Sequence, residues 1–227
     1  MTQEKKILSF VRRKGKKLSK AKLDLINDLL PNIEIKDLCT SEILTKLIKQ
    51  KEAKINLEIG YGNGEHLAMQ GRLRPEELFI GCEPYLKGTV NLLSQIKTNN
   101  LENIYIYQDD AIELLNKLPN NFLNKIYILF PDPWPKTKHH KRRIINNYNL
   151  KIIGDKLKPN GLLRIATDHS EYASWIIAKM INQPVFTWEI KNINDWHKEP
   201  CDWTQTKYQE KALAGKKYYF FNFTKLG

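Results

Sequence analysis

From residue 55 to residue 182, short apolar runs alternate with segments whose apolar residues recur at helical spacing. The runs are of strand length and lie at 55–59, 78–82, 104–107, 126–130 and 162–166. The segments between and after them predict helices at 65–73, 87–97, 111–118, 143–157 and 170–182, the last capped by Ser170. Strands that alternate with helices over short connections favour an α/β fold, with a mostly parallel sheet and helices on both faces.

Two more apolar runs, 185–190 and 217–223, complete seven predicted strands. The connection between them is polar, is rich in Trp, Lys and Asp, and contains no convincing helix. We therefore expect these late strands to pair in antiparallel fashion, and a connection of this length is often functional.

The beginning of the chain differs from the rest. Apolar residues at helical spacing follow Ser41, which predicts a short helix with Ser41 as its N-cap. Residues 1–40 are expected to form a basic and flexible N-terminal arm, and residues 41–227 a single catalytic domain.

Positive charge is concentrated in two segments. The net charge is +12, and residues 1–22 contain nine Lys or Arg with one acid, while residues 136–143 contain five with no acid. The remainder is therefore close to neutral. Localised positive charge favours a phosphate backbone as partner, although a solvated basic surface would give the same pattern. We expect a nucleic acid as partner.

The cysteines and the apolar runs limit where the protein can act. Cys39, Cys82 and Cys201 are widely spaced and form no CxxC pair, which indicates reduced thiols rather than a disulfide or zinc site. No apolar run approaches the roughly 20 residues that span a bilayer, and the lysine-rich start lacks the apolar segment of a secretory signal. We expect a cytoplasmic protein that uses no membrane and has no obligate protein partner.

A glycine-rich turn joins the first predicted strand to the next helix, at Gly60, Gly62 and Gly64. Glycines let the backbone approach a ligand and adopt positive φ, and a helix N-terminus attracts negative groups. The spacing is G-x-G-x-G, which differs from the G-x-G-x-x-G of dinucleotide sites and lacks the G-K-S/T ending of a nucleotide-triphosphate loop. The turn therefore argues against NAD and against phosphoryl transfer.

Acids lie at or near the ends of the first three strands, as Glu58, Glu83 and Asp110. Ligands of open α/β sheets bind at the carboxyl edge of the strands, so these acids can converge on one ligand. Carboxylates suit a ligand with ribose hydroxyls, an ammonium and an exocyclic amine, and S-adenosylmethionine has all three. We expect Glu83 to hold the ribose diol and Asp110 to face the adenine edge. For each acid alone, capping of the next helix is the alternative.

Residues 130–143 place one carboxylate among three prolines and then run into five positive charges. Proline restricts the residue before it, so Phe130, Asp132 and Trp134 are expected in extended conformations that hold Asp132 rigidly. Trp134 either stacks on an RNA base or braces this loop. The neighbouring histidines have no suitably spaced third ligand, so no metal site is expected.

Four motifs together resemble the bacterial tRNA (guanine-N7-)-methyltransferases. They are residues 57–64, residues 80–83, residues 130–136 with 139–143, and residues 166–168. The resemblance covers about Ile55 to Gly227. It implies a Rossmann-like class I methyltransferase fold, and transfer of a methyl group from S-adenosylmethionine to N7 of the variable-loop guanine of tRNA.

The resemblance also implies roles for single residues. The implied cofactor residues are Glu58, Gly60, Gly62, Gly64, Glu83, Asp110 and Asp132. Asp132 matches the catalytic aspartate of the family, and Lys136 and Asp168 match residues that contact the substrate. The implied RNA contacts are Lys138, His139, His140, Lys141, Arg142 and Arg143.

The C-terminal T-x-(F/Y)-E element of the family is altered in this chain. The matching residues are Thr206, Lys207, Tyr208 and Gln209, implied to contact the substrate. An amide therefore stands where the family has an acid. Either Gln209 replaces the acid as a hydrogen-bond acceptor, or Glu210 reaches the site instead.

Two other functions fit parts of the sequence. The segment 132–135 loosely resembles the D-P-P-Y loop of enzymes that methylate an exocyclic amine of adenine or cytosine, but here Trp134 lies between the prolines. A non-catalytic RNA-binding protein with this fold is the second alternative. It would be expected to have lost cofactor residues, whereas the glycines and acids named above are all present.

Overall fold

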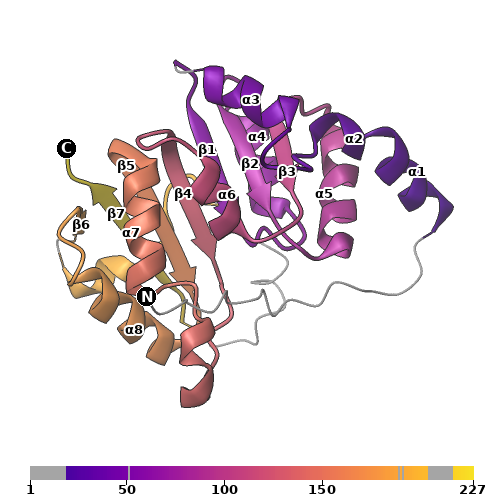
Figure 1. Ribbon diagram of the computed structural model, residues 1–227. Helices are drawn as coiled ribbons and strands as arrows, with labels where there is room; N and C mark the ends of the chain where they lie inside the picture. The colour runs from indigo at the N-terminus through magenta and orange to yellow at the C-terminus, as the bar shows by residue number, and fades with distance from the viewer. Residues whose placement is uncertain (1–18, 51, 189, 191, 204–216) are drawn as a thin grey trace.

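The computed structural model describes residues 19–50, 52–188, 190, 192–203 and 217–227 (Figure 1). Over these residues one sheet has the strand order β3-β2-β1-β4-β5-β7-β6. The strands are β1 (Ile55–Ile59), β2 (Leu78–Cys82), β3 (Ile104–Tyr107), β4 (Leu123–Leu129), β5 (Leu157–Thr167), β6 (Phe186–Trp188) and β7 (Tyr219–Lys225). Strands β1 to β5 are parallel, and β7 lies antiparallel between β5 and β6. The predicted seven-stranded, mostly parallel sheet with an antiparallel C-terminal strand is confirmed.

Strand boundaries match the sequence pattern best in the first three strands. The bounds of β1, β2 and β3 are those predicted, whereas β4 begins earlier and ends at Leu129, and β5 begins at Leu157. Strand β5 contains a bulge between residues 157 and 162, because the pairing jumps from Leu123↔Leu157 to Lys125↔Leu162. Asn160 within the bulge has φ of 61°.

The helices of the domain also follow the pattern. They are α3 (Glu42–Lys49), α4 (Glu65–Leu73), α5 (Leu86–Asn99), α6 (Ala111–Lys117), α7 (Asn147–Lys156) and α8 (Ser170–Met180). Ser41 caps α3 as expected, since its hydroxyl oxygen accepts from the Leu44 N–H. The start of α7 and the cap of α8 differ from expectation. Asn146 caps α7 after a 3-10 helix, η1 (Thr137–Arg142), and the cap of α8 is His169, whose Nδ1 accepts from the Tyr172 N–H at 3.3 Å.

Part of the expected N-terminal arm is folded onto the domain. Helices α1 (Lys20–Asp28) and α2 (Leu30–Ile33) lie beside α5 and β3. Leu30 and Ile35 are buried, and the Ile35 N–H donates to the Ile106 carbonyl oxygen at 2.8 Å. The domain as folded therefore begins before Ser41. Residues 1–18 lie outside the described part of the chain.

The two faces of the sheet are covered differently. One face packs against α3, α6, α7 and α8, and the other packs against α2, α4 and α5. Each face has its own hydrophobic cluster, and the neighbouring β2 residues Ile80 and Phe79 belong to the first and to the second cluster, respectively. On that second face, over β4, β5 and β7, a small cluster around Tyr127 and Phe220 is covered by Trp203. A second 3-10 helix, η2 (Ile193–His197), lies in the same long connection as Trp203. Within the described ranges, no helix has the length and apolar character needed to cross a membrane.

Candidate active site

The glycine-rich turn after β1 adopts a conformation that requires its glycines. Gly60, Gly62 and Gly64 have φ of 73°, 56° and 82°, in the left-handed region that favours glycine. A Cβ on Gly64 would lie 2.8 Å from the Leu92 Cβ, and one on Gly88 would overlap the Gly62 carbonyl oxygen. Among the described residues, no atom lies within 4 Å of the Cβ positions at Gly60 and Gly62. The turn is thus packed against α5 on one side and leaves room for a ligand on the other.

Glu83 connects this turn to the end of β2. Its Oε2 accepts from the Gly62 N–H at 3.1 Å and its Oε1 from the Tyr85 N–H at 3.0 Å. Burial raises the pKa of Glu83, the two backbone N–H groups lower it, and the charge of Asp132 raises it, with a net increase. The carboxylate is therefore fixed beside the glycine turn and within electrostatic reach of Asp132. Each carboxylate oxygen has a second lone pair with which it can accept from a ligand.

Asp110 lies at the carboxyl end of β3 and caps α6. Its Oδ1 accepts from the Ile112 N–H at 2.8 Å, so the capping alternative considered for this acid is realised. Capping also orients the carboxylate at the same sheet edge as Glu83. Burial, and then the charges of Asp110 and Glu83, raise the pKa of the Cys82 thiol, so both carboxylates lie near the end of β2.

Glu58 lies behind the turn rather than at the open edge. Only 3% of Glu58 is exposed, and its Oε2 lies 2.7 Å from Nδ1 of the equally buried His66 on α4. His66 also contacts the ring of Trp203, with centroids 5.7 Å apart. The sequence analysis did not identify His66. The signal for it was a histidine in the first turn of the helix that follows the acid.

The loop after β4 differs from its predicted conformation. Phe130 and Trp134 have φ of 50° and 43°, so the expectation that residues before proline are extended is wrong for both. The Phe130 N–H donates to the Ala166 carbonyl oxygen at 2.8 Å, which extends the pairing of β4 with β5 and turns the chain sharply. Non-glycine residues in this region cost about 1–3 kcal/mol each, so contacts elsewhere must hold the loop.

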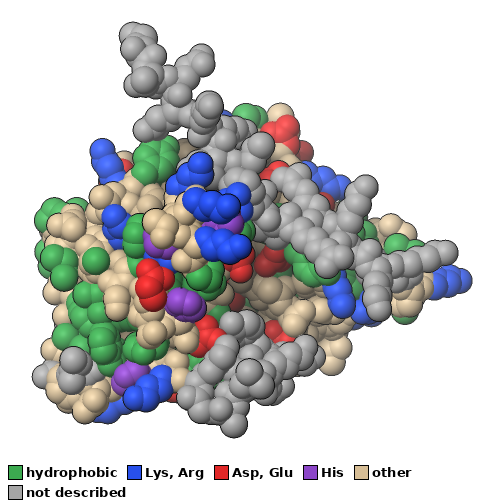
Figure 2. Space-filling model, turned by 90° about the horizontal axis from the view of Figure 1, so that it is seen from below, with side chains coloured by type: hydrophobic (Ala, Val, Ile, Leu, Met, Phe, Trp, Pro, Cys, Tyr) green, Lys and Arg blue, Asp and Glu red, His purple; other side chains and the backbone are tan. Residues whose placement is uncertain are grey.

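Asp132 and Asp168 follow the neighbouring strands β4 and β5, which are in register at Leu129↔Ala166. Asp132 is exposed and Asp168 is half-buried. Both lie at the carboxyl edge, onto which Figure 2 looks from below. There, Lys, Arg and His side chains gather beside acidic side chains. Basic and acidic side chains therefore share this face of the molecule.

The basic segment that follows is short, and most of its cations face solvent. Lys136, Lys138 and Lys141 are exposed. The Arg142 guanidinium lies over the Trp134 ring, 4.9 Å from its centroid, and the His139 ring meets the same indole edge-on at 5.8 Å. These contacts favour the bracing role of Trp134. Desolvation and then the surrounding cations, Arg142 first, lower the pKa of His139, which favours its neutral form.

Arg143 does not lie with these exposed cations, although it was expected to contact RNA. It is 1% exposed, and its guanidinium forms a bidentate ion pair with Glu171 on α8, at 3.1 and 2.6 Å. It also donates to carbonyl oxygens in the backbone of the Asp132 loop. A charge count along the sequence cannot show that one cation of such a run turns inward.

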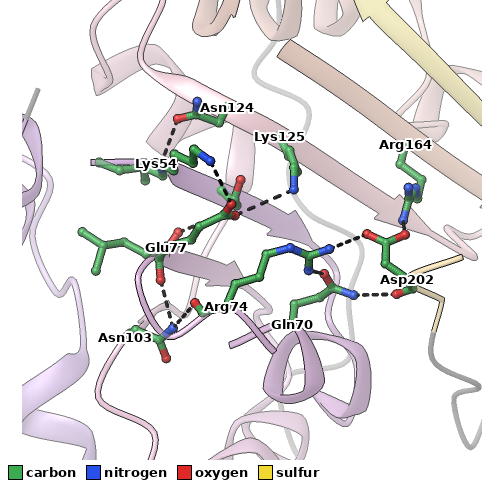
Figure 3. A network of polar contacts seen from close by, with 12 residues as sticks. Lys54, Gln70, Arg74, Glu77, Asn103, Asn124, Lys125, Arg164 and Asp202 are labelled. Atoms are coloured by element: carbon green, nitrogen blue, oxygen red, sulfur yellow. Dashed lines mark hydrogen bonds and ion pairs between the residues drawn. The ribbon is translucent and has the colours of Figure 1, made fainter. Parts of the chain in front are cut away.

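Asp202 is a polar centre that the sequence analysis did not identify (Figure 3). Its carboxylate pairs with Arg164 of β5 at 2.6 Å and with Arg74 at 2.8 Å, and its carbonyl oxygen accepts from Gln70 at 2.9 Å. Arg74 also donates to the Gln70 side chain. Asp202 therefore ties the long connection to α4 and β5, next to Trp203.

The predicted C-terminal substrate element lies outside the part of the chain that the structure describes. The four residues expected to form the C-terminal substrate element, Thr206 to Gln209, lie outside the described residues. In the described part of the chain, no group of three or more His, Cys, Asp or Glu side chains is placed to hold a metal ion.

The described site fits a ligand that carries hydroxyl groups and positive charge. Open space lies in front of Gly60 and Gly62, and the carboxylate of Glu83 borders the turn through the Gly62 N–H. Asp110 adds a second carboxylate after β3, the strand next to β2. Carboxylates accept hydrogen bonds from ribose hydroxyls and amines and stabilise cations. They would repel a phosphate, which agrees with the absence of a nucleotide-triphosphate motif.

Solved structures with low sequence identity share the fold. An antibiotic-related methyltransferase superposes with a TM-score of 0.56 at 18% identity, over 82% of this chain and 94% of that chain. A 16S rRNA methyltransferase superposes with a TM-score of 0.57 at 10% identity, again over 82% and 94%. The fold is therefore that of the Rossmann-like class I methyltransferases.

Sequence comparisons identify the family. The methyltransferase family model Methyltransf_4 matches residues 52–221. A tRNA (guanine-N(7)-)-methyltransferase of Zymomonas mobilis is 37% identical over 95% of this chain and 93% of its own length. Proteins of the same name from Bartonella quintana and Agrobacterium fabrum are 41% and 37% identical, over 90% and 93% of this chain and 89% and 94% of their own lengths. The chain belongs to the tRNA (guanine-N(7)-)-methyltransferase family.

Proposed function

We propose that this protein transfers the methyl group of S-adenosylmethionine to N7 of the variable-loop guanine of tRNA, in the cytoplasm and without an obligate protein partner. The names of its relatives support the reaction. The observation that carries the proposal is the position of Asp132. It follows β4 at the carboxyl edge of the sheet, its charge acts on Glu83 beside the glycine turn, and the exposed Lys136 and Lys138 lie four and six residues further along the chain.

Each part of the cofactor fits a described group. Glu83 would accept from the ribose hydroxyls, and Asp110 from the adenine amine, while Gly60 and Gly62 leave room for close approach. Glu58, which is hydrogen-bonded to His66, would support the glycine turn from its buried side. When bound, S-adenosylmethionine supplies an electrophilic methyl group on a sulfonium.

The proposed chemistry needs positioning more than proton transfer. N7 of guanine is an unprotonated lone pair, so no base has to remove a proton before it reacts, and the enzyme must hold N7 in line with the methyl group. Methylation leaves a positive charge on the imidazole ring of guanine, which a fixed carboxylate stabilises. A carboxylate can also accept from guanine N1–H and N2–H. Asp132 and Asp168 divide these two tasks between them, and Lys136 helps to hold the substrate.

The test is incubation with labelled S-adenosylmethionine and unmodified tRNA transcripts. We expect one methyl group per transcript that carries the variable-loop guanine, and none when adenine replaces that guanine. Mapping the methylated atom separates N7 from an exocyclic amine. Label on an exocyclic amine, or equal label on both transcripts, would contradict the proposal. Failure to bind S-adenosylmethionine in calorimetry would favour a non-catalytic RNA-binding protein.

We also expect the exposed cations to set the salt dependence of tRNA binding. Replacing Lys138, Lys141 and Arg142 by methionine removes three positive charges beside the site. The slope of log affinity against log salt should then decrease in magnitude by about 2, because fewer counterions are released from the RNA. Binding measured at several salt concentrations checks this. An unchanged slope would show that the run is only solvated surface.

A further inference from the structure

Arg143 is the largest fully buried side chain of the described residues, and it is charged. Its Nε–H donates to the Pro133 carbonyl oxygen at 2.8 Å, and its Nη2 donates to the Trp134 carbonyl oxygen at 3.4 Å. Pro133 is the residue directly after Asp132. The arginine therefore holds the carbonyl groups of the first two residues that follow the proposed catalytic carboxylate.

On its other side Arg143 pairs with helix α8, and we call this link from the Asp132 loop through Arg143 to Glu171 the clamp. Both Glu171 oxygens accept from Arg143, and Glu171 lies in the first turn of α8, where the helix dipole stabilises an acid. The aromatic rings of Tyr172 and Trp175, on the same helix, lie 5.1 and 4.6 Å from the guanidinium carbon. The hydrogen bond from Arg143 is the main cause of the lowered pKa of Glu171, so the pair stays ionised at neutral pH.

The clamp joins the two strand ends that carry the site. Asp132 follows β4, and α8 begins two residues after Asp168, at the end of β5. The loop that contains Asp132 has Phe130 and Trp134 in the left-handed region, so it depends on contacts with the rest of the fold to keep this shape. Arg143 supplies such contacts, and its ion pair with Glu171 connects them to α8, which begins next to Asp168.

We propose that Arg143 is a positioning residue that fixes Asp132 relative to Asp168, and that it makes no contact with RNA. The importance of this spacing for turnover rests on the function proposed above. An arginine suits the task because its planar fork binds a carboxylate with two nitrogens while its third nitrogen serves the loop. A lysine keeps the charge but cannot form this fork.

The clamp can be tested without activity, by hydrogen exchange of residues 128–136. We expect Arg143→Lys to increase exchange there at least about tenfold, with residues 104–112 unchanged as the internal control. Glu171→Ala changes an exposed side chain and should keep the fold. It is expected to increase exchange of the same loop by a smaller factor. Unchanged loop exchange in both variants would overturn the clamp.

The role in turnover is tested by separating kcat from KM. Because misplacement of a reacting group by about 1 Å costs up to roughly 100-fold, we expect Arg143→Lys to lower kcat by about 10- to 100-fold. Its KM for tRNA should stay within about twofold, and its salt slope should equal that of the wild type. Lys141→Met is the comparator, expected to raise the KM for tRNA. Should Arg143→Lys raise KM and reduce the salt slope while kcat is kept, Arg143 is an RNA contact. If the wild-type protein methylates no tRNA, the proposed function fails, and the exchange experiment still decides the clamp.

Discussion

Replacing Asp132 by alanine is expected to lower methyl transfer by about 100- to 1000-fold and to leave tRNA affinity within about twofold of the wild type. A fixed charge that acts on a developing charge contributes about this much to a rate. Asp132 is exposed at the end of β4, and the residue after it is held by Arg143, so its loss should not disturb the fold. Tight binding to RNA depends on the neighbouring cations, which are unchanged. Single-turnover rates at saturating S-adenosylmethionine, together with binding titrations, check both expectations.

Two further variants separate charge from shape at this position. Asp132→Asn keeps the size of the side chain and removes the charge, so we expect a loss nearly as large as with alanine. Asp155→Ala removes another exposed aspartate, on α7 and outside the site, and should leave turnover unchanged. Near-wild-type turnover of Asp132→Ala would exclude Asp132 as the catalytic residue.

The sequence predicts the boundaries of those helices and strands whose ends are marked by local residues. The bounds of β1, β2 and α4 agree with prediction because glycine, proline or a change of hydrophobic period marks each end. The start of α8 was placed correctly, but its cap was not, since Ser170 and His169 are both able to cap and the backbone selected His169. The bulge in β5 depends on the pairing with β4, which is invisible along the chain.

Within the site, residue types were predictable and their surroundings were not. Glu83 and Asp110 lie at the expected sheet edge because parallel strands end together. The conformations of Phe130 and Trp134 were predicted wrongly because contacts with Ala166 and Arg143 override the local preference before proline. The ion pair with Glu171, 28 residues further along the chain, also buries Arg143, whereas the lysines near it in sequence stay exposed. Asp202 is the clearest case, since its partners precede it by 38 and 128 residues.

Asp202→Asn is expected to lower the free energy of unfolding by about 2–3 kcal/mol, and Tm by about 4–10 °C. The reason is that the Arg164 side chain is only 7% exposed and would lose its one charged partner in the described structure. Arg74 is 20% exposed and can regain water, so most of the cost should come from Arg164. Unfolding in urea, followed by circular dichroism, measures the effect. Lys198→Ala is a suitable control because it removes an exposed ion pair, with Asp195, and should cost less than about 1 kcal/mol.

A double variant and the pH dependence test the cause. If the cost comes from an unpaired arginine, then Arg164→Met combined with Asp202→Asn should be more stable than Asp202→Asn alone.

Burial by itself would raise the pKa of Asp202, but Arg164 and Arg74 outweigh it, so the folded pKa lies below the ordinary value. A depressed carboxyl pKa stabilises the fold above the unfolded value of about 4, and this stability is lost as the pH falls through the folded pKa. The difference between wild type and Asp202→Asn should therefore be constant from pH 6 to pH 8 and shrink below about pH 4. A constant difference down to pH 3 would mean that the two arginines do not act through the charge of Asp202.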